Sequence, residues 1–278
     1  MATFSVCIYF GTTVDTGAKD ALRASRRRTL RAASERHLNY MLKKTEPSNE
    51  KSGFFREQVP GLSLIGDIGN RIRGMWELDG QAWVVGGNKL YELFPDMSFE
   101  ERGTLQTGTG VVSLAQGLFS LMIVDGIHGY VLNLADNVFG QITDPDFFGS
   151  ERVFFLDGKF IIVDPGTQKF GWSEGIDGAT SYDALDFASA ESSPDKIVGH
   201  IVDHREIWLM GSEKSEVWYP SPGTNQVYAR NNGAVIEVGC AAAHSIQQVD
   251  NSIAWLGKDK RGQGVVWLAG GSNGYTPL

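Results

Sequence analysis

The stretch YDALDFASAESSPDKIVGHIVDHREIWLMGSEKSEVWYP, residues 182–220, decides the fold. It opens with a polar loop and continues into an apolar strand, which we expect to turn at Asp203-His204 and to return over residues 206–210. A second turn at Gly211-Ser212 leads into a third predicted strand, residues 215–219. Short runs that alternate apolar and polar residues between turn residues are typical of antiparallel strands. One such unit cannot bury its own faces, so other parts of the chain must pack against it.

Four further segments repeat this order of strand, tight turn, apolar strand, second turn and strand. The five repeats are RIRGMWELDGQAWVVGGNKLYELF (71–94), GVVSLAQGLFSLMIVDGIHGYVLNL (110–134), ERVFFLDGKFIIVDPGTQKFGWS (151–173), KIVGHIVDHREIWLMGSEKSEVWYP (196–220) and AHSIQQVDNSIAWLGKDKRGQGVVWLAG (243–270). Their first turns are expected at Asp79-Gly80, Gln116-Gly117, Asp157-Gly158, Asp203-His204 and Asp250-Asn251. Asp-Gly and similar pairs supply the positive φ angles that two-residue hairpin turns require.

A period of about 40–47 residues with three or four strands per unit is typical of a β-propeller. A β-sandwich is the main alternative, but it would not explain five copies of one hairpin pattern. We therefore predict an all-β fold, a β-propeller of about five visible three- to four-stranded antiparallel repeats, which need not be the full set. Residues 37–278 are predicted to form the propeller domain and residues 1–36 a basic N-terminal extension, either poorly ordered or helical.

The charge of the chain is unevenly distributed. The formal net charge is −8, which argues against a protein that coats nucleic acid, since phosphate binding needs a basic surface. Residues 1–45 nevertheless hold nine Lys or Arg and three acidic residues. The segment ALRASRRRTLRAASER (21–36) could bind an anionic partner or be an exposed terminal extension, and we favour the extension.

The two cysteines, Cys7 and Cys240, belong to no CxxC or Cys/His cluster, so we expect reduced thiols and no structural zinc site. No apolar run approaches the roughly 18 residues of a membrane span. At the N-terminus the basic cluster follows the apolar segment, which is the wrong order for a secretory signal.

Aromatic residues and histidines are expected to be structural. The seven tryptophans fall within or beside predicted strands, where large aromatic side chains pack between sheets. Trp83, Trp208 and Trp255 are expected at equivalent core positions of their repeats, with Ile161 in that place in the third. The histidines, expected to be structural or solvent-facing, are His37, His128, His200, His204 and His244.

No catalytic motif is present. The chain lacks GxSxG, GxxxxGK[ST], HExxH and the calcium-loop spacing. Acidic pairs occur at Asp144/Asp146 and Asp183/Asp186, but Asp in loops most often serves turns. We predict no catalytic, cofactor-binding or metal residue and no enzymatic activity. The alternative is a propeller that binds or hydrolyses glycans through paired carboxylates.

A resemblance to a known family covers roughly residues 37–278. It is most specific in YDALDFASAESSPDKIVG, VDHREIWLMG, SEVWYP and NNGAVIEVGCAAAHS, all within residues 182–245. PGLSLIG (60–66), RGMW (73–76), GGNKLYEL (86–93) and VDNSIAWLGKDKRGQGVVW (249–267) continue it in the same order. These segments resemble the phage packaged-DNA stabilisation proteins, the tail hub or nozzle of short-tailed phages.

The resemblance implies a non-enzymatic virion component without cofactors, made in the bacterial host cytoplasm. It implies a homo-oligomeric ring of six copies that contacts the portal, its adaptor and other tail proteins, extends the DNA channel and keeps packaged DNA from leaking. DNA would pass nearby without sequence-specific binding, and no membrane span is implied. Members of the family are considerably longer, so we expect a fragment or truncated reading frame. The loop at residues 182–195 is interpreted as a connection between blades.

Overall fold

The computed structural model of the chain is built of β-strands. The structure describes residues 40–44, 54–58, 66–78, 80–191, 194–221, 227–249, 251–258, 264–270 and 274–277. Within these ranges the only helical element is the 3-10 turn η2 (Ala243–Ser245). The predicted extension at residues 1–36 lies outside the described residues.

The chain divides into two compact units. One is Ser5–Asp67, whose described part is an antiparallel hairpin of β1 (Tyr40–Lys44) and β2 (Phe54–Gln58). The other runs from Ile68 to Leu278. The five-sheet unit thus starts at Ile68. The start of the propeller domain at residue 37, which was inferred from the sequence, stays a prediction.

Five four-stranded antiparallel sheets make up the larger unit, and we call them blades 1 to 5 in chain order. Blade 1 consists of β3 (Ile72–Leu78), β4 (Gln81–Gly86), β5 (Lys89–Leu93) and β6 (Phe99–Thr104). Blade 2 consists of β7 (Ser113–Gln116), β8 (Ser120–Val124), β9 (Gly129–Asn133) and β10 (Phe139–Gln141). Blade 3 consists of β11 (Val153–Leu156), β12 (Lys159–Val163), β13 (Lys169–Trp172) and β14 (Phe187–Ser189). Blade 4 consists of β15 (Ile197–Asp203), β16 (Glu206–Gly211), β17 (Ser215–Pro220) and β18 (Tyr228–Ile236). Blade 5 consists of β19 (Gln247–Val249), β20 (Ser252–Lys258), β21 (Gly264–Ala269) and β22 (Tyr275–Pro277).

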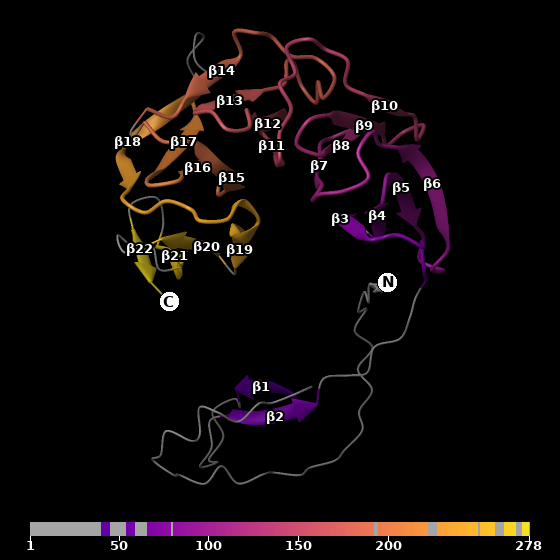
Figure 1. Cartoon of the computed structure of the whole chain (residues 1–278), viewed down its shortest axis with the longest axis horizontal. Coiled ribbons are helices and arrows are strands. Elements are labelled where there is room, and N and C mark those ends of the chain that lie inside the picture. Colours follow the sequence, from indigo (N-terminus) through magenta and orange to yellow (C-terminus); the bar gives the residue numbers. More distant parts are fainter. Residues whose placement is uncertain are drawn as a thin grey trace. The chain divides into compact units, whose positions relative to one another are not determined.

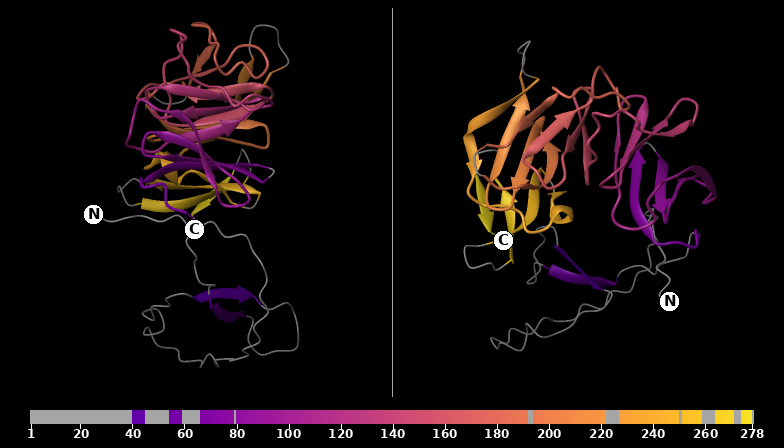
Figure 2. Two further views of the ribbon diagram at one scale, coloured as in Figure 1. Left: turned by 90° about the vertical axis from the view of Figure 1, so that its right-hand side faces the viewer. Right: turned by 45° about the horizontal axis from the view of Figure 1, so that its top comes forward.

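The blades follow one another around a central axis in the order of the sequence (Figure 1). The first strands are innermost: β3 contacts β7, β7 contacts β11, and β11 contacts β15. The left view of Figure 2 is turned by 90° from that of Figure 1. In it the strands run roughly across the picture, so they lie along the direction in which Figure 1 is viewed. This arrangement is a β-propeller, and the predicted fold class is confirmed.

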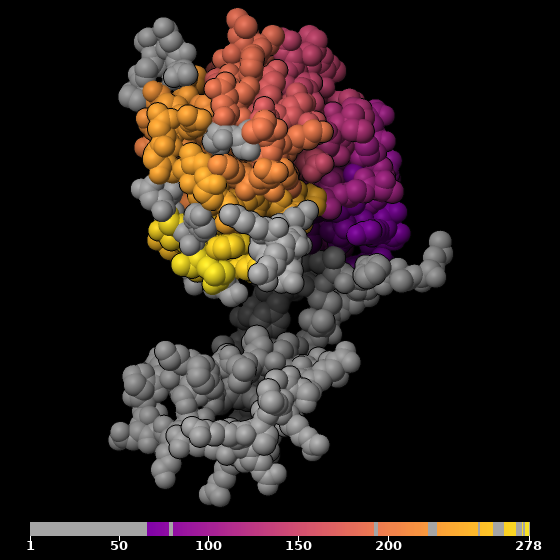
Figure 3. Space-filling view, turned by 60° about the vertical axis from the view of Figure 1, so that its left-hand side comes forward, coloured from indigo at the N-terminus to yellow at the C-terminus, as the bar shows by residue number. Residues whose placement is uncertain are grey.

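Apolar clusters fill the space between neighbouring blades. Trp83 and Leu90 of blade 1 pack with Leu121 and Ile123 of blade 2, and similar clusters join blades 2 and 3, 3 and 4, and 4 and 5. In Figure 3 the colours of successive blades abut, as expected when side chains fill the space between sheets. Among the described residues, no such cluster joins blade 5 to blade 1.

Turn chemistry explains why the repeats fold into hairpins, with two corrections to the prediction. In blade 3, Asp157 (φ 48°) and Gly158 (φ 87°) form the predicted turn. In blade 4 Asp203 pairs with Glu206, so the turn is His204-Arg205, one residue later than predicted. In blade 2 Gln116 pairs with Leu121 and the N–H of Gly117 donates to Ser120 O at 2.8 Å, so the turn is Leu118-Phe119, two residues later than predicted.

The predicted equivalence of the tryptophans is wrong for Trp255. Trp83 and Trp208 are each the third residue after the first turn, and both face the following blade. Trp255 is the fourth, because Ser252 pairs with Val249. Since side chains alternate along a strand, a shift of one residue turns Trp255 towards blade 4, where it is 1% exposed.

Each predicted repeat covers the first three strands of its blade, and the fourth strand lies beyond it. The stretch at residues 182–195 illustrates the error. It contains β14, the outer strand of blade 3, so the interpretation of the whole stretch as a connection between blades is wrong. The connection to blade 4 begins only after Ser189.

Candidate functional site

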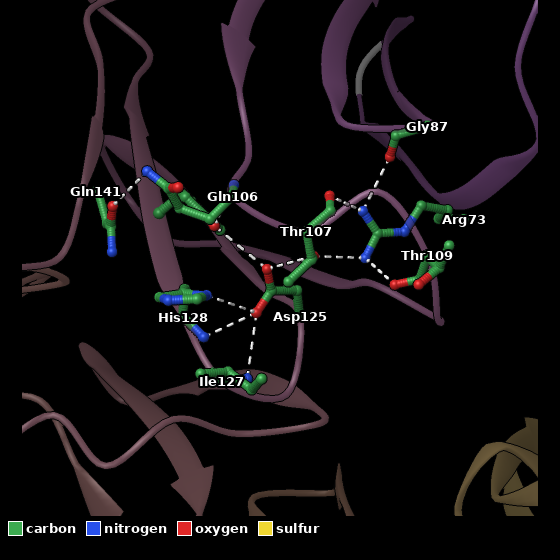
Figure 4. A network of polar contacts seen from close by, with 10 residues as sticks. Arg73, Gly87, Gln106, Thr107, Thr109, Asp125, Ile127, His128 and Gln141 are labelled. Carbon is green, nitrogen blue, oxygen red and sulfur yellow. Dashed lines mark hydrogen bonds and ion pairs between the residues drawn. The ribbon is translucent and has the colours of Figure 1, made fainter.

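A network of polar contacts lies at the junction of blades 1 and 2 (Figure 4). Arg73, on the innermost strand of blade 1, is 6% exposed. Its Nε donates to Gly110 O at 2.9 Å and its Nη1 to Gly87 O at 2.9 Å and Thr107 O at 2.6 Å. Its Nη2 donates to Thr109 O at 2.6 Å and to Thr107 Oγ1 at 2.8 Å. One guanidinium thereby holds the loop that carries the chain from blade 1 to blade 2.

Asp125, in the β8–β9 turn, continues this network. Its Oδ2 accepts hydrogen bonds from Thr107 Oγ1 at 2.6 Å and from the Tyr130 hydroxyl at 3.2 Å. Its Oδ1 accepts from the backbone N–H groups of Ile127 at 3.2 Å and His128 at 2.7 Å. The hydroxyl of Thr107 therefore links a buried cation to a buried carboxylate, one in each blade.

Burial and hydrogen bonding shift the pKa values of this network. Burial would raise the pKa of Asp125, but the hydrogen bonds from Thr107 and from two backbone N–H groups outweigh it and lower the pKa. Burial lowers the pKa of Arg73, with Asp125 opposing the change, and raises the pKa of Tyr130 to about 12. The carboxylate is thus held ionised and the phenol neutral.

This geometry suits the fastening of two blades better than proton transfer. Both oxygens of Asp125 are occupied by donors. His128 Nδ1 lies 3.7 Å from Asp125 Oδ1, beyond hydrogen-bonding distance, and has no hydrogen-bond partner. A general base must lie within hydrogen-bonding distance, about 2.6–3.2 Å between heavy atoms, of the group whose proton it takes.

The junction of blades 2 and 3 has a second fastening. Asp177, in the loop between β13 and β14, accepts from the backbone N–H groups of Leu118 at 3.1 Å and Phe119 at 2.8 Å, and from Ser120 Oγ at 3.1 Å. Its own N–H donates to Gly158 O at 2.7 Å. Asp177 therefore fixes the β7–β8 turn of blade 2 from the neighbouring blade. We call this contact the Asp177 clasp.

Histidines join the later blades. His200 is 1% exposed, and its Nε2 lies 3.2 Å from Ile161 O, so the neutral ring donates from blade 4 to blade 3. Burial, with the nearby charge of Arg152, lowers its pKa to about 3. His204 lies 2.7 Å from Asp203 Oδ2 and 2.9 Å from Asn251 Oδ1 of blade 5, and these contacts raise its pKa. The prediction that these histidines are structural agrees with this geometry.

Arg152 reaches from blade 3 to the connection between blades 4 and 5. Its Nη1 donates to Ala243 O at 2.8 Å and its Nη2 to Ile246 O at 3.1 Å. Its guanidinium also lies 5.1 Å from the ring centroid of Phe154. Each arginine that is held in this way binds backbone carbonyls, which fixes loops in place.

The acidic pairs named from the sequence close loops. Asp144 Oδ1 accepts from Asp146 N–H at 2.9 Å and Asp144 Oδ2 from Tyr182 N–H at 3.1 Å. Asp183 Oδ1 accepts from Leu185 N–H at 2.8 Å. No group of three or more His, Cys, Asp or Glu among the described residues could hold a metal ion, and Cys240 is a buried free thiol.

Sequence reasoning missed Arg73 and Asp177. An arginine on an otherwise apolar inner strand, within RGMW, was the available signal for Arg73. Nothing in the sequence distinguishes Asp177 from other loop aspartates, because its partners are about 58 residues away. No helix among the described residues is long and apolar enough to cross a membrane.

The fold is a β-propeller in which buried polar side chains such as Arg73 and His200 help to join neighbouring blades. A family model described as bacteriophage P22 Gp10, β-propeller, matches residues 34–276. The chain therefore belongs to this family of phage packaged-DNA stabilisation proteins, and the resemblance noted in the sequence is confirmed. No curated protein matches the chain.

Solved structures support the fold. The chain is similar to the extracellular domain of the putative one component system BT4673 from B. thetaiotaomicron, at 11% identity and a TM-score of 0.51, over 81% of this chain and 30% of that one. It is similar to the extracellular domain of the putative hybrid two component system BT4673 from the same organism, at 9% identity and a TM-score of 0.50, over 87% and 35%. The chain thus spans about a third of the length of these proteins. At such identities the likeness shows the fold alone.

Proposed function

We propose that this chain is a non-enzymatic structural component of a phage virion, part of the tail hub below the portal, that extends the DNA channel and helps to retain packaged DNA. The match of the family model over residues 34–276 carries the proposal. In this role copies of the chain adjoin one another in a ring, six by resemblance to the family, and meet the adaptor and other tail proteins.

The geometry of the polar groups supports this role. The arginines and carboxylates of the junctions bind backbone groups and hold successive blades together, as a rigid structural component requires. Of the two acidic pairs considered for glycan hydrolysis, Asp144 and Asp146 lie in one loop, where Asp144 binds the backbone of Asp146, and Asp183 binds the backbone of Leu185. No observation therefore favours the glycan alternative.

The test is a phage carrying a nonsense mutation in the gene for this chain, grown in a non-suppressing host. We expect heads that package DNA and then lose it, measured as the fraction of empty heads by electron microscopy and as nuclease-accessible DNA in lysates. Supplying the full chain from a plasmid should restore full heads. Full, infectious particles without the chain would contradict the proposal, as would failure to detect the chain in purified virions.

A further inference from the structure

The outer strand of blade 4 departs from a regular ladder. In the register of β17 with β18, consecutive pairs are Glu216 with Val235 and Trp218 with Arg230. One residue of β17 therefore faces residues 231–234, which have no partner in this register and form a bulge. Because β18 is also the last strand of its sheet, no described strand pairs with its other edge. The backbone of the bulge is thus held by fewer ladder contacts than that of an inner strand.

The bulge carries an Asn-Gly pair, and both Asn232 and Gly233 are exposed. The atom nearest to a Cβ added at Gly233 would be Asn231 Oδ1, at 3.6 Å, and no other atom would lie within 4 Å. Glycine has no Cβ to shield its backbone nitrogen or to restrict its backbone. The side-chain amide of the preceding asparagine therefore has access to the nitrogen of Gly233.

The side-chain amide of Asn232 is oriented by a neighbouring cation. Arg230 Nε donates a hydrogen bond to Asn232 Oδ1 at 3.0 Å. Since a guanidinium only donates, the oxygen of the amide must face it. The guanidinium polarises the Cγ–Oδ1 bond, and it would stabilise the negative charge that develops on Oδ1 when a nucleophile attacks Cγ. Cγ of Asn232 is therefore more electrophilic than that of an asparagine in water.

The backbone nitrogen of Gly233 is the nucleophile closest to Asn232 along the chain. Its N–H donates to Asn231 Oδ1 at 3.2 Å, in an exposed contact. The acceptor belongs to a side chain of the same bulge and not to the partner strand. An attack by this nitrogen therefore breaks one exposed hydrogen bond, which contributes little to stability, and no bond between strands.

We propose that Asn232 deamidates spontaneously in the folded chain and that Arg230 promotes the reaction. The nitrogen of Gly233 forms a bond to Cγ of Asn232, and the Cγ–Nδ2 bond breaks. Water carries the proton from the attacking nitrogen to Nδ2, which leaves as ammonia. Water then opens the resulting cyclic imide at either carbonyl and leaves an aspartate or an isoaspartate at position 232. Water is the only co-reactant, and the inference does not depend on the proposed function.

The reaction would change the electrostatics of blade 4. Arg230 Nη1 lies 3.8 Å from Oε1 of Glu216, a carboxylate whose residue is 2% exposed. A new carboxylate at position 232 would face the same guanidinium and add one negative charge. An isoaspartate also lengthens the main chain by one atom, which a bulge outside the register accommodates.

The experiment follows the intact full chain in mildly alkaline buffer, both folded and unfolded in urea, by peptide mapping with mass spectrometry. Deamidation adds about 1 Da, and chromatography separates aspartate from isoaspartate. The map also separates Asn232 from Asn273, which precedes the other Asn-Gly pair of the sequence and lies outside the described residues. We expect Asn232 to react at least as fast in the folded chain as in the unfolded chain.

Two variants test the roles of the neighbours. Gly233→Ala should slow the reaction about 10-fold in both states, because a Cβ then hinders the attacking nitrogen. Arg230→Leu should slow it about 5-fold in the folded chain alone, because the donor is placed at Oδ1 only by the fold. The matched control is Arg71→Leu, which removes the same charge from an exposed position in another blade and should leave the rate unchanged.

Two results would overturn the inference. One is an intact Asn232 in the folded wild type after the unfolded chain has reacted completely, a comparison that needs no variant. The other is a folded Arg230→Leu chain, shown to be folded by its thermal melting, that reacts as fast as the wild type.

Discussion

At the residue scale, Arg73 concentrates several contacts in one side chain. Replacing Arg73 with Ala removes the donor to the carbonyls of Gly87, Thr107 and Thr109. It also removes the cation that the Thr107 hydroxyl links to Asp125. We expect a loss of roughly 2–4 kcal/mol in the free energy of unfolding, since buried groups lose charged hydrogen-bond partners. Urea denaturation followed by tryptophan fluorescence measures it. The matched control is Arg71→Ala, whose exposed side chain lies two residues away. Equal midpoints for the two variants would show that the hydrogen bonds of Arg73 contribute nothing to stability.

His200 should make the propeller sensitive to acid. Its pKa is about 3 in the folded chain and about 6.5 in the unfolded chain. As the pH falls below 6.5, the imidazole is therefore protonated in the unfolded state but stays neutral in the folded state. Stability is therefore present above pH 6.5 and is lost as the pH falls towards 3. At pH 5 the loss is about 2 kcal/mol.

Denaturation of wild type and His200→Asn at pH 7 and pH 5 isolates this contribution, because all other groups titrate alike. The variant should lose about 2 kcal/mol less than the wild type over this interval. His244→Asn, at an exposed position in η2, should behave as the wild type. An unchanged pH dependence in His200→Asn would refute the assignment.

At the element scale, the sequence predicts hairpins well and blade edges poorly. Asp157-Gly158 makes its turn as predicted because only a few residue pairs adopt two consecutive positive φ angles. Two of the missed outer strands, β10 (Phe139–Gln141) and β14 (Phe187–Ser189), are only three residues long, which is too short for alternation to be visible. The face of Trp255 depends on a register difference of one residue, which only the pairing of Ser252 with Val249 reveals.

Close packing of the blade 4–5 connection on blade 4 depends on Gly239. A Cβ at this position would overlap the backbone of Ser212 and Glu213, which cannot move as a side-chain end can. We expect Gly239→Ala to lower the free energy of unfolding by about 2–3 kcal/mol, the usual cost of overpacking. The control is Gly140→Ala in β10, where no atom lies within 4 Å and stability should be unchanged or slightly higher. Thermal unfolding of both variants measures the difference, and comparable melting temperatures would mean that the connection can shift.

At the scale of the whole molecule, the repeat period predicted the β-propeller, whereas the polar contacts between blades could not be predicted. Arg73 and Thr107 are 34 residues apart, and His200 and Ile161 are 39 apart. These pairs meet only because successive blades lie side by side. The period of a repeat defines such neighbours in general, but it does not say which side chains point across each junction.

The separation of charge along the chain gives a prediction about DNA. Residues 46–278 hold 16 Lys or Arg and 30 acidic residues, so the five blades should repel phosphate, while the basic cluster around Arg26, Arg27 and Arg28 attracts it. We expect the full chain to bind duplex DNA weakly at 50 mM salt. Replacement of these three arginines by Gln should make the negative slope of log Kobs against log salt concentration shallower by about 3. Fluorescence anisotropy of a labelled duplex over a salt series measures the slope.

The control for DNA binding removes three cations from the blades, namely Arg205, Lys214 and Arg230, each of which lies beside a carboxylate. Replacing them with Gln should leave the salt slope unchanged, because their charges are already balanced within the fold. A triple N-terminal variant that binds DNA as tightly as the wild type, together with a control variant that binds more weakly, would instead mean that the blades themselves bind phosphate. A channel wall that gripped phosphate would slow the passage of DNA, so that outcome would also count against a conduit through which DNA must move freely.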